Sequence, residues 1–137
     1  MRGSRPDASA SDAEFAAAVP GGPGAGEVRG TVHGSGLSLT REGSSALTVV
    51  SASGEVDAAT VAPFALLLSS AAAEAEGSLL VDLDELSFLD VKGYVALLNA
   101  DRKMRERGGE VVILCSRPTI RRIFTVRDPR GRLRLCP

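Results

Sequence analysis

The chain has 137 residues, 44% of them hydrophobic, and a formal net charge of −1. A chain of this length forms one domain with a single modest core. It has no apolar run long enough to cross a bilayer and no apolar N-terminal stretch of the secretory type, so we expect a cytoplasmic protein without membrane insertion.

The first 35 residues are rich in Ala, Gly, Ser and Pro. Such a composition buries too little apolar surface to offset the entropy lost on ordering. We therefore predict a disordered arm over residues 1–35 and one folded domain over residues 36–137. Residues 12–19 have the pattern of a transient helical turn, but nothing in the sequence commits them to the fold.

Alternating apolar residues begin the folded part. The alternating residues 37–39 precede a turn at residues 42–44, and the apolar segment 46–52 follows it, a pattern that predicts a β-hairpin. Apolar residues at helical spacing then predict a helix over residues 60–76, with Gly77 as its C-terminal cap.

The stretch from residue 79 to residue 107 is the most informative, because a buried strand there runs through a short polar turn into an amphipathic helix. Asp90 is placed to be the N-cap, where its carboxylate accepts free backbone N–H groups. Lys92 is unexpected, since a cation in the first turn opposes the helix dipole by roughly 0.3–1 kcal/mol. The turn Asp90-Val91-Lys92-Gly93 is therefore the candidate working surface, and an exposed lysine that is simply tolerated is the alternative.

The predicted helix has two faces. One is apolar and is expected to pack on the sheet: Val91, Tyr94, Leu97, Leu98 and Met104. The other is expected to be solvated: Lys92, Asn99, Lys103 and Glu106. With the turn, this polar face forms a ridge that a partner can contact. Asp101 falls among the apolar positions, and we expect it to lie at the rim or to pair with Arg105 one turn later.

Gly108-Gly109 ends this helix, and residues 111–114 are predicted to form a second buried strand. Ser116 is predicted to cap a short helix with Pro118 in its first turn, and a last strand is predicted over residues 132–136. Strands that alternate with helices imply parallel pairing. The predicted fold is therefore α/β, with a mixed sheet of about four to five strands and helices packed mainly on one face.

The C-terminal part contains many arginines and both cysteines. Residues 117–137 hold seven arginines and one aspartate, but the chain is only 4% aromatic and has no nucleic-acid-reading motif. We expect these arginines to pair with acidic groups of this protein or of a partner, and we expect no nucleic-acid binding. Cys115 and Cys136 are expected to be free thiols, and a regulatory disulfide between neighbouring strands is the alternative.

Three segments together resemble the STAS domain, the module of bacterial anti-sigma-factor antagonists and of the cytoplasmic part of sulfate transporters. Gly54-Glu55-Val56-Asp57 resembles the family's turn before its first helix. Residues 81–90 (VDLDELSFLD) resemble the strand that approaches the phosphorylation loop. Residues 107–114, followed by residues 118–124, resemble the next strand and short helix. The resemblance covers residues 37–136.

This resemblance implies a SpoIIAA-like fold and a binding module that regulates sigma-factor-dependent transcription by binding an anti-sigma factor of the serine-kinase type. Members of the family are switched off when that kinase phosphorylates a serine just before the loop glycine, which adds about −1.5 to −2 charges. This chain has Lys92 at that position and Val91 beside it, and its nearest hydroxyl is that of Ser87. The resemblance therefore implies no phosphorylation at the usual position, with constitutive binding or control by another input.

The residues assigned to partner binding are Glu55, Asp57, Asp90, Val91, Lys92, Gly93, Asn99 and Lys103. We expect a monomer or weak dimer that needs no cofactor and holds no metal. An enzyme is not expected, because the single histidine, His33, lies in the arm and the acidic residues 82–85 are more typical of a solvated strand end. The alternatives are a STAS subunit of a lipid or anion transport complex and a nucleotide-binding STAS regulator.

Overall fold

The computed structural model describes residues 30–34, 36–44 and 46–136, with side chains from residue 36 on. These residues form six strands and three helices: β1 (Gly30–Gly34), β2 (Leu37–Gly43), β3 (Leu47–Val56), α2 (Val61–Glu74), β4 (Ser78–Leu89), α3 (Val91–Arg105), β5 (Glu110–Leu114), α4 (Pro118–Arg127) and β6 (Arg134–Cys136).

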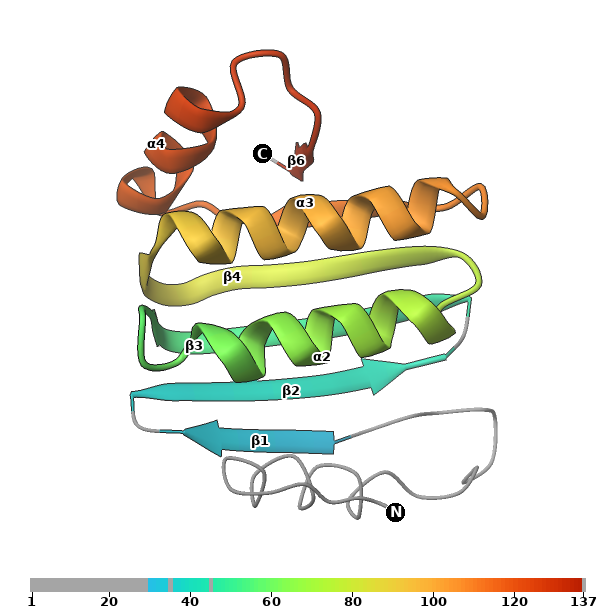
Figure 1. Ribbon diagram of the computed structural model, residues 1–137, viewed down its shortest axis with the longest axis horizontal. Coiled ribbons are helices and arrows are strands. Elements are labelled where there is room, and N and C mark those ends of the chain that lie inside the picture. The colour runs from blue at the N-terminus through green and yellow to red at the C-terminus, as the bar shows by residue number, and fades with distance from the viewer. Residues whose placement is uncertain (1–29, 35, 45, 137) are drawn as a thin grey trace.

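The strands form one mixed sheet in the order β1-β2-β3-β4-β5-β6. The pairs β1–β2 and β2–β3 are antiparallel, and the pairs from β3 to β6 are parallel. Helices α2 and α3 lie side by side on one face of this sheet, and α4 lies beside α3 at the β6 end (Figure 1). The predicted α/β fold with helices mainly on one face is therefore confirmed.

The sheet has one strand more than the four to five expected. Residues Gly30–Gly34, which the sequence assigned to the arm, pair with β2 and form β1 at the edge of the sheet. Residues 1–29 lie outside the described residues, so the disordered arm stays a prediction there.

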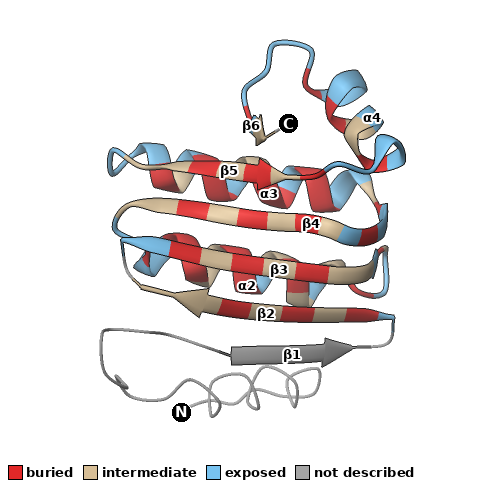
Figure 2. Ribbon diagram, turned by 180° about the vertical axis from the view of Figure 1, so that it is seen from behind, coloured by how far each residue is buried: buried red, intermediate tan, exposed pale blue. Residues whose placement is uncertain are grey.

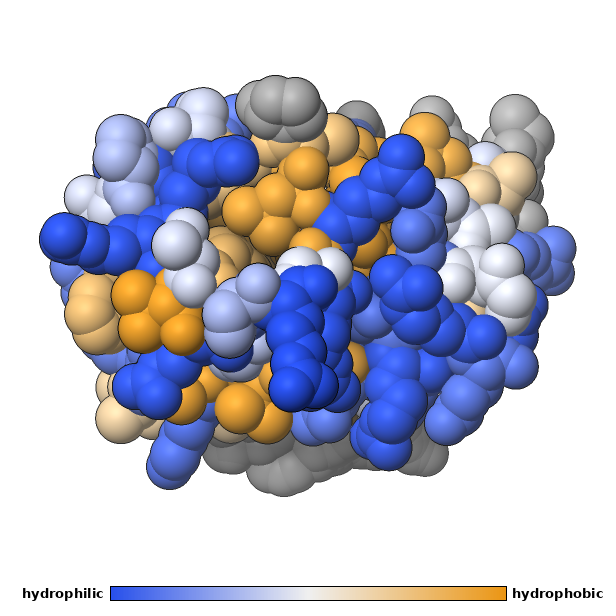
Figure 3. All heavy atoms as spheres, turned by 90° about the horizontal axis from the view of Figure 1, so that it is seen from above, coloured by the Kyte–Doolittle hydropathy of each residue, from blue (hydrophilic) through white to orange (hydrophobic). Residues whose placement is uncertain are grey.

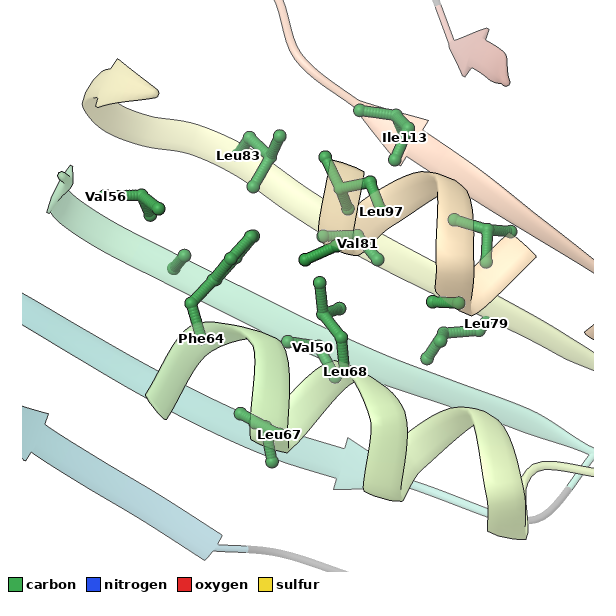
Figure 4. Packing of buried hydrophobic residues seen from close by; sticks show 14 of the residues in the cluster. Val50, Val56, Phe64, Leu67, Leu68, Leu79, Val81, Leu83, Leu97 and Ile113 are labelled. Carbon is green, nitrogen blue, oxygen red and sulfur yellow. The ribbon is translucent and has the colours of Figure 1, made fainter. Parts of the chain in front are cut away.

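The core lies between the sheet and the two long helices (Figure 4). Its largest fully buried side chains come from both layers: Phe64, Leu39, Leu68, Leu79, Leu83, Leu86, Leu97, Met104, Ile113, Ile120, Val50 and Val56. On α2, the buried residues Phe64, Leu67, Leu68 and Ala71 have the spacing i, i+3, i+4, i+7 that the sequence analysis used to predict this helix. Each such side chain stabilises the fold by about 1.5–3 kcal/mol relative to an exposed one.

The end of α2 differs from the prediction. The helix ends at Glu74 with Ala75 as C-cap, so Gly77 is not its cap. A Cβ at Gly77 would lie 2.2 Å from the carbonyl oxygen of Ala46, and glycine is required there because the two backbones touch. The carbonyl oxygens at the end of α2 instead accept hydrogen bonds from the guanidinium group of Arg107, which follows α3.

The start of α4 also differs from the prediction. Its N-cap is Arg117, which makes no side-chain capping bond, and Pro118 is its first residue. Ser116 instead donates hydrogen bonds from its backbone N and its hydroxyl to Oδ1 of Asp84, at 2.7 and 3.1 Å. The carboxylate of Asp84 thus joins the middle of β4 to the segment after β5.

Asp101 pairs with Arg105 as expected, with 2.7 Å between Oδ2 and the arginine Nε. It is buried rather than at a rim, with 5% of its surface exposed, because its Oδ1 also accepts a hydrogen bond from the backbone N of Val111. The carboxylate, through its hydrogen bond, is the main cause that raises the pKa of Arg105. Asp101 therefore ties α3 to the start of β5.

Some of the C-terminal arginines form ion pairs or hydrogen bonds within the domain. Arg134 forms an ion pair with Glu110 at 3.1 Å, and Arg121 donates to the carbonyl oxygens of Cys115 and Cys136. Figure 3 looks onto this edge of the molecule, where hydrophilic side chains surround small apolar patches. Both cysteines are free thiols. Among the described residues, no helix is long and apolar enough to cross a membrane.

Candidate functional site

The corner between β4 and α3 has the predicted capping geometry. Asp90 is the N-cap of α3, and its Oδ1 accepts a hydrogen bond from the backbone N of Val91 at 2.6 Å. The backbone carbonyl of Asp90 accepts hydrogen bonds from the N–H groups of Gly93 and Tyr94. The N–H of Asp90 in turn donates to the carbonyl of Val56 at the end of β3. The corner is thus held to the sheet on one side and to the helix on the other.

Gly93 is part of this corner for a steric reason. A Cβ at this position would lie 2.6 Å from Cδ1 of Leu89 and 2.8 Å from Cγ1 of Val56. The first turn of α3 therefore rests directly on the apolar ends of β3 and β4. Gly93 is buried and supports the surface rather than offering a side chain to a partner.

Lys92 points to solvent from the first turn of α3. Among the described residues it has no ion pair, and no acidic residue lies in that turn. Its charge opposes the helix dipole by roughly 0.3–1 kcal/mol, and no ion pair with a described residue offsets this cost. The protein thus presents an unpaired ammonium group at the corner.

Two further predicted residues, Glu55 and Asp57, lie where β3 ends, at the same end of the sheet as the corner. Glu55 is exposed and is paired in register with Phe88 of β4. Asp57 has a structural role, because its Oδ1 accepts hydrogen bonds from the N–H groups of Ala59 and Thr60 and from the hydroxyl of Thr60. It organises the turn into α2, so Glu55 is the more accessible of the two for a partner.

The predicted ridge along α3 is only partly solvated. Asn99 is exposed two turns after Lys92, but Lys103 is half-buried and its Nζ donates to the hydroxyl of Ser69 on α2 at 2.5 Å. A shallow hollow of about 220 Å³ runs between α2 and α3 beside Asn99 and Lys103. The expectation of a fully solvated Lys103 is therefore wrong, because α2 lies close enough to bind its ammonium group.

Apolar side chains near Lys92 in sequence are exposed, and the sequence analysis missed two of them, Phe88 and Val95. Phe88, Val91 and Val95 are 48%, 40% and 44% exposed. Val91 was expected to pack on the sheet, but Tyr94, Leu97, Ala100 and Met104 fill that side of α3. The available signal was the spacing of Val91, Val95 and Leu98 at i, i+4, i+7, which marks a second apolar stripe beside the first. We call Phe88, Val91, Val95 and Lys92 the corner patch.

The nearby hydroxyl and acidic groups are engaged in the fold. The hydroxyl of Ser87 donates to the carbonyl of Gly54 at 3.0 Å. Oδ1 of Asp82 accepts from the backbone N of Asp84. Within residues 36–44 and 46–136, no group of three or more His, Cys, Asp or Glu side chains is arranged to hold a metal ion.

The order of elements, the sheet and this corner can be compared with those of known proteins. The family model described as the STAS domain matches residues 38–127, which is most of the folded part. The chain belongs to the STAS family. No curated protein matches this STAS domain.

Solved structures share its fold. An anti-sigma factor antagonist from Mycobacterium paratuberculosis is 24% identical, with a TM-score of 0.67 over 74% of this chain and 86% of that one. The anti-sigma factor antagonist SpoIIAA in its unphosphorylated form is 22% identical, with a TM-score of 0.62 over 72% and 88% of the two chains. The Bacillus cell fate determinant SpoIIAA in its phosphorylated form is also 22% identical, with a TM-score of 0.57 over 72% and 91%. This STAS domain therefore has the SpoIIAA-like fold that its sequence predicted.

Proposed function

We propose that this STAS domain is an anti-sigma factor antagonist that binds an anti-sigma factor of the serine-kinase type through the corner patch and Glu55, and that serine phosphorylation does not switch it off at this corner. The observation that carries the proposal is the exposed, unpaired ammonium group of Lys92 at the position before Gly93. Both the family and the shared fold with antagonists support the general role.

The chemistry of the corner supports the absence of the switch. A serine kinase transfers a phosphoryl group to a hydroxyl oxygen, and neither Lys92 nor Val91 has one. Ser87 lies three residues before the N-cap, within β4, and its hydroxyl is bonded to the backbone of β3. Phosphorylation of Ser87 would break this bond, so the residue is a poor substitute for a loop serine.

The charge at the corner indicates what kind of surface it binds. A phosphoserine here would add about −1.5 to −2 charges, whereas Lys92 supplies a fixed positive charge. A partner that contacts it therefore offers acidic side chains, with apolar side chains opposite Phe88, Val91 and Val95. The buried apolar contacts supply affinity, and the charge pair supplies selectivity.

The switch is tested by incubating the protein with a serine-kinase-type anti-sigma factor from the same genome and ATP, followed by mass spectrometry of residues 87–93. We expect no phosphoserine in this segment. Lys92→Ser is the companion variant, and we expect it to gain phosphate because the kinase then meets a hydroxyl before Gly93. Stoichiometric phosphate on the unaltered segment would overturn the proposed absence of a switch.

Binding is tested by titration calorimetry with the same anti-sigma factor. Lys92→Glu is expected to weaken binding at least tenfold, since one partner of a charge pair is reversed within the contact. Arg122→Glu is the matched control, because Arg122 is exposed on α4 and carries the same charge. We expect Arg122→Glu to change the affinity less than about twofold. Equal losses in the two variants would show a general charge effect and would contradict the assigned site.

A further inference from the structure

A shallow hollow lies between α2 and α3 on the outer side of the helix layer, here called the α2–α3 hollow. Both helices alternate between buried and exposed residues, since only their inner sides pack on the sheet (Figure 2). The two helices meet at the hollow through small side chains, those of Ala65 on α2 and of Ala96 and Ala100 on α3. These methyl groups leave about 220 Å³ unfilled.

The charged side chains that line the α2–α3 hollow are cationic. They are Arg102 and Lys103, and no Asp or Glu of the described residues lines it. Lys103 is half-buried, and its Nζ donates to the hydroxyl of Ser69 at 2.5 Å. Neither cation forms an ion pair with a described residue, and Arg102 donates a long bond of 3.5 Å to Asn99. The hollow thus holds two positive charges that no described carboxylate neutralises.

This arrangement favours an anionic occupant. The hydroxyl of Ser69 accepts one of the three N–H donors of Lys103, but a neutral group does not offset the charge of a half-buried ammonium group. A carboxylate supplies both an acceptor and the opposite charge. The planar guanidinium group of Arg102 matches the geometry of a carboxylate, and the attraction is screened less in a partly buried hollow than in open water.

The size of the hollow indicates which kind of anion enters it. Pockets that hold cofactors and other small molecules have volumes of about 300–1,000 Å³. The α2–α3 hollow is smaller, at about 220 Å³, and its alanine walls offer contacts to methylene groups. It therefore fits a single acidic side chain of another protein better than it fits a nucleotide.

We propose that the anti-sigma factor inserts an Asp or Glu side chain into the α2–α3 hollow, where its carboxylate binds Arg102 and Lys103. This inference rests on the proposed function and adds a second anchor to the corner patch. Lys92, Asn99 and Lys103 have the spacing i, i+7, i+11, so Lys92 and the hollow lie on the same side of α3.

The spacing of the two anchors defines the surface of the partner. Ala100, at the middle of the hollow, follows Lys92 by about eight residues, which is about 12 Å along the helix axis. The anti-sigma factor therefore presents two acidic groups about 12 Å apart, one for Lys92 and one for the hollow.

Titration calorimetry with the serine-kinase-type anti-sigma factor tests the role of the charge. Lys103→Met keeps an unbranched side chain and removes the ammonium group, and we expect it to weaken binding at least tenfold. Arg122→Met removes an exposed positive charge on α4 and should change the affinity less than about twofold. Unchanged affinity of Lys103→Met beside weakened binding of Lys92→Glu would overturn this inference and leave the proposed function standing. Absence of binding by the unaltered protein would overturn both.

A second pair of variants tests the space without changing any charge. Ala65→Leu fills the hollow from the α2 side, and we expect it to weaken binding at least tenfold because the acidic side chain no longer enters. Ala73→Leu places the same side chain at an exposed position of α2 that does not line the hollow, and it should change the affinity less than about twofold. Equal affinities of the two variants would contradict the proposed insertion.

A double-mutant cycle separates a direct contact from an effect on the fold. Each acidic residue of the anti-sigma factor is neutralised in turn, and its binding is measured to the unaltered domain and to Lys103→Met. One such change should weaken binding to the unaltered domain at least tenfold but alter binding to Lys103→Met less than about twofold, because that contact is already lost. If no acidic residue of the partner shows this coupling, the proposal is wrong.

Discussion

At the scale of single residues, the corner between β4 and α3 departs from what helix stability favours. Asp90 caps α3 as local chemistry predicts, but the next turn carries an uncompensated cation and two exposed valines. Residues that disfavour the local structure are concentrated at functional sites, since they do not stabilise the fold. The proposed contact with a partner would account for Lys92.

Tyr94, two residues after Lys92, joins α3 to α4. Its hydroxyl donates to the carbonyl of Arg127 at 3.1 Å, and its ring packs edge-on against Phe124 with centroids 5.9 Å apart. Burial raises the pKa of this phenol, the negative charge of Asp128 adds to the effect, and Arg132 opposes it. The neutral phenol is thus the form that the folded state favours.

The titration of Tyr94 is directly measurable, because it is the only tyrosine and the chain has no tryptophan. Absorbance at the phenolate band should give a pKa above the ordinary value of about 10. The stabilisation is present below about pH 10 and is lost as pH rises through the raised pKa, so the stability advantage over Tyr94→Phe should shrink above pH 10. Urea unfolding on both sides of that pH measures it, and a normal or lowered pKa would contradict the assignment.

At the scale of elements, Arg107 explains how α2 ends without a glycine cap. Its guanidinium group donates to the carbonyl oxygens of Ala72, Ala73 and Ala75, which have no partner within the helix or only a partial one. A positive charge at a helix C-terminus is also favoured by the dipole. One side chain from the end of α3 therefore closes the end of α2 and holds the two helices in register.

Removing this side chain should destabilise the domain. We expect Arg107→Ala to lower the free energy of unfolding by about 1–2 kcal/mol, because three carbonyl oxygens, two of them part-buried, lose a charged donor. Arg102→Ala is the control, since Arg102 is exposed on α3 and donates only a 3.5 Å bond to Asn99, and its cost should stay below about 0.5 kcal/mol. Denaturant unfolding measures both. Equal costs would mean that the bonds to α2 contribute little.

The sequence predicted the elements better than their ends. Periodicity identified both long helices and the buried strands, because apolar spacing reflects which face is covered. It misassigned Gly77 and Ser116, since their roles depend on Ala46 and Asp84, which are distant in sequence. It also missed the exposure of Phe88 and Val95, because an apolar residue in a pattern carries no sign of whether another element covers it.

At the scale of the whole molecule, the two cysteines lie on opposite faces of the sheet. Leu114 and Cys136 are paired in register, so both project from the face of the sheet opposite α2 and α3. Cys115 is the next residue after Leu114 and points the other way, into the core, where burial is the main cause that raises the pKa of its thiol. Neighbouring strands alone thus do not bring these two thiols together, and a regulatory disulfide between them would require β6 to leave the sheet.

Thiol modification tests this arrangement. Cys136 should react quickly with a chromogenic disulfide reagent, whereas Cys115 should react only when the domain unfolds, because it has no exposed surface and a raised pKa. Cys136→Ser should leave a single slow phase that speeds up with denaturant. Two fast phases in the native protein, or an intramolecular disulfide under mild oxidation, would show that β6 opens readily.

The close backbone contacts around Gly77 have a consequence for how such a domain can be altered. A Cβ on Gly77 would lie 2.2 Å from the carbonyl oxygen of Ala46, and one on Gly109 would lie 2.3 Å from that of Gly77, so the three segments that lead into β3, β4 and β5 are in direct backbone contact. At Gly77 and Gly109 there is therefore no space for a larger side chain. Larger side chains or insertions that change what the domain binds are better placed at the other end of the sheet, where β3, β4 and β5 finish.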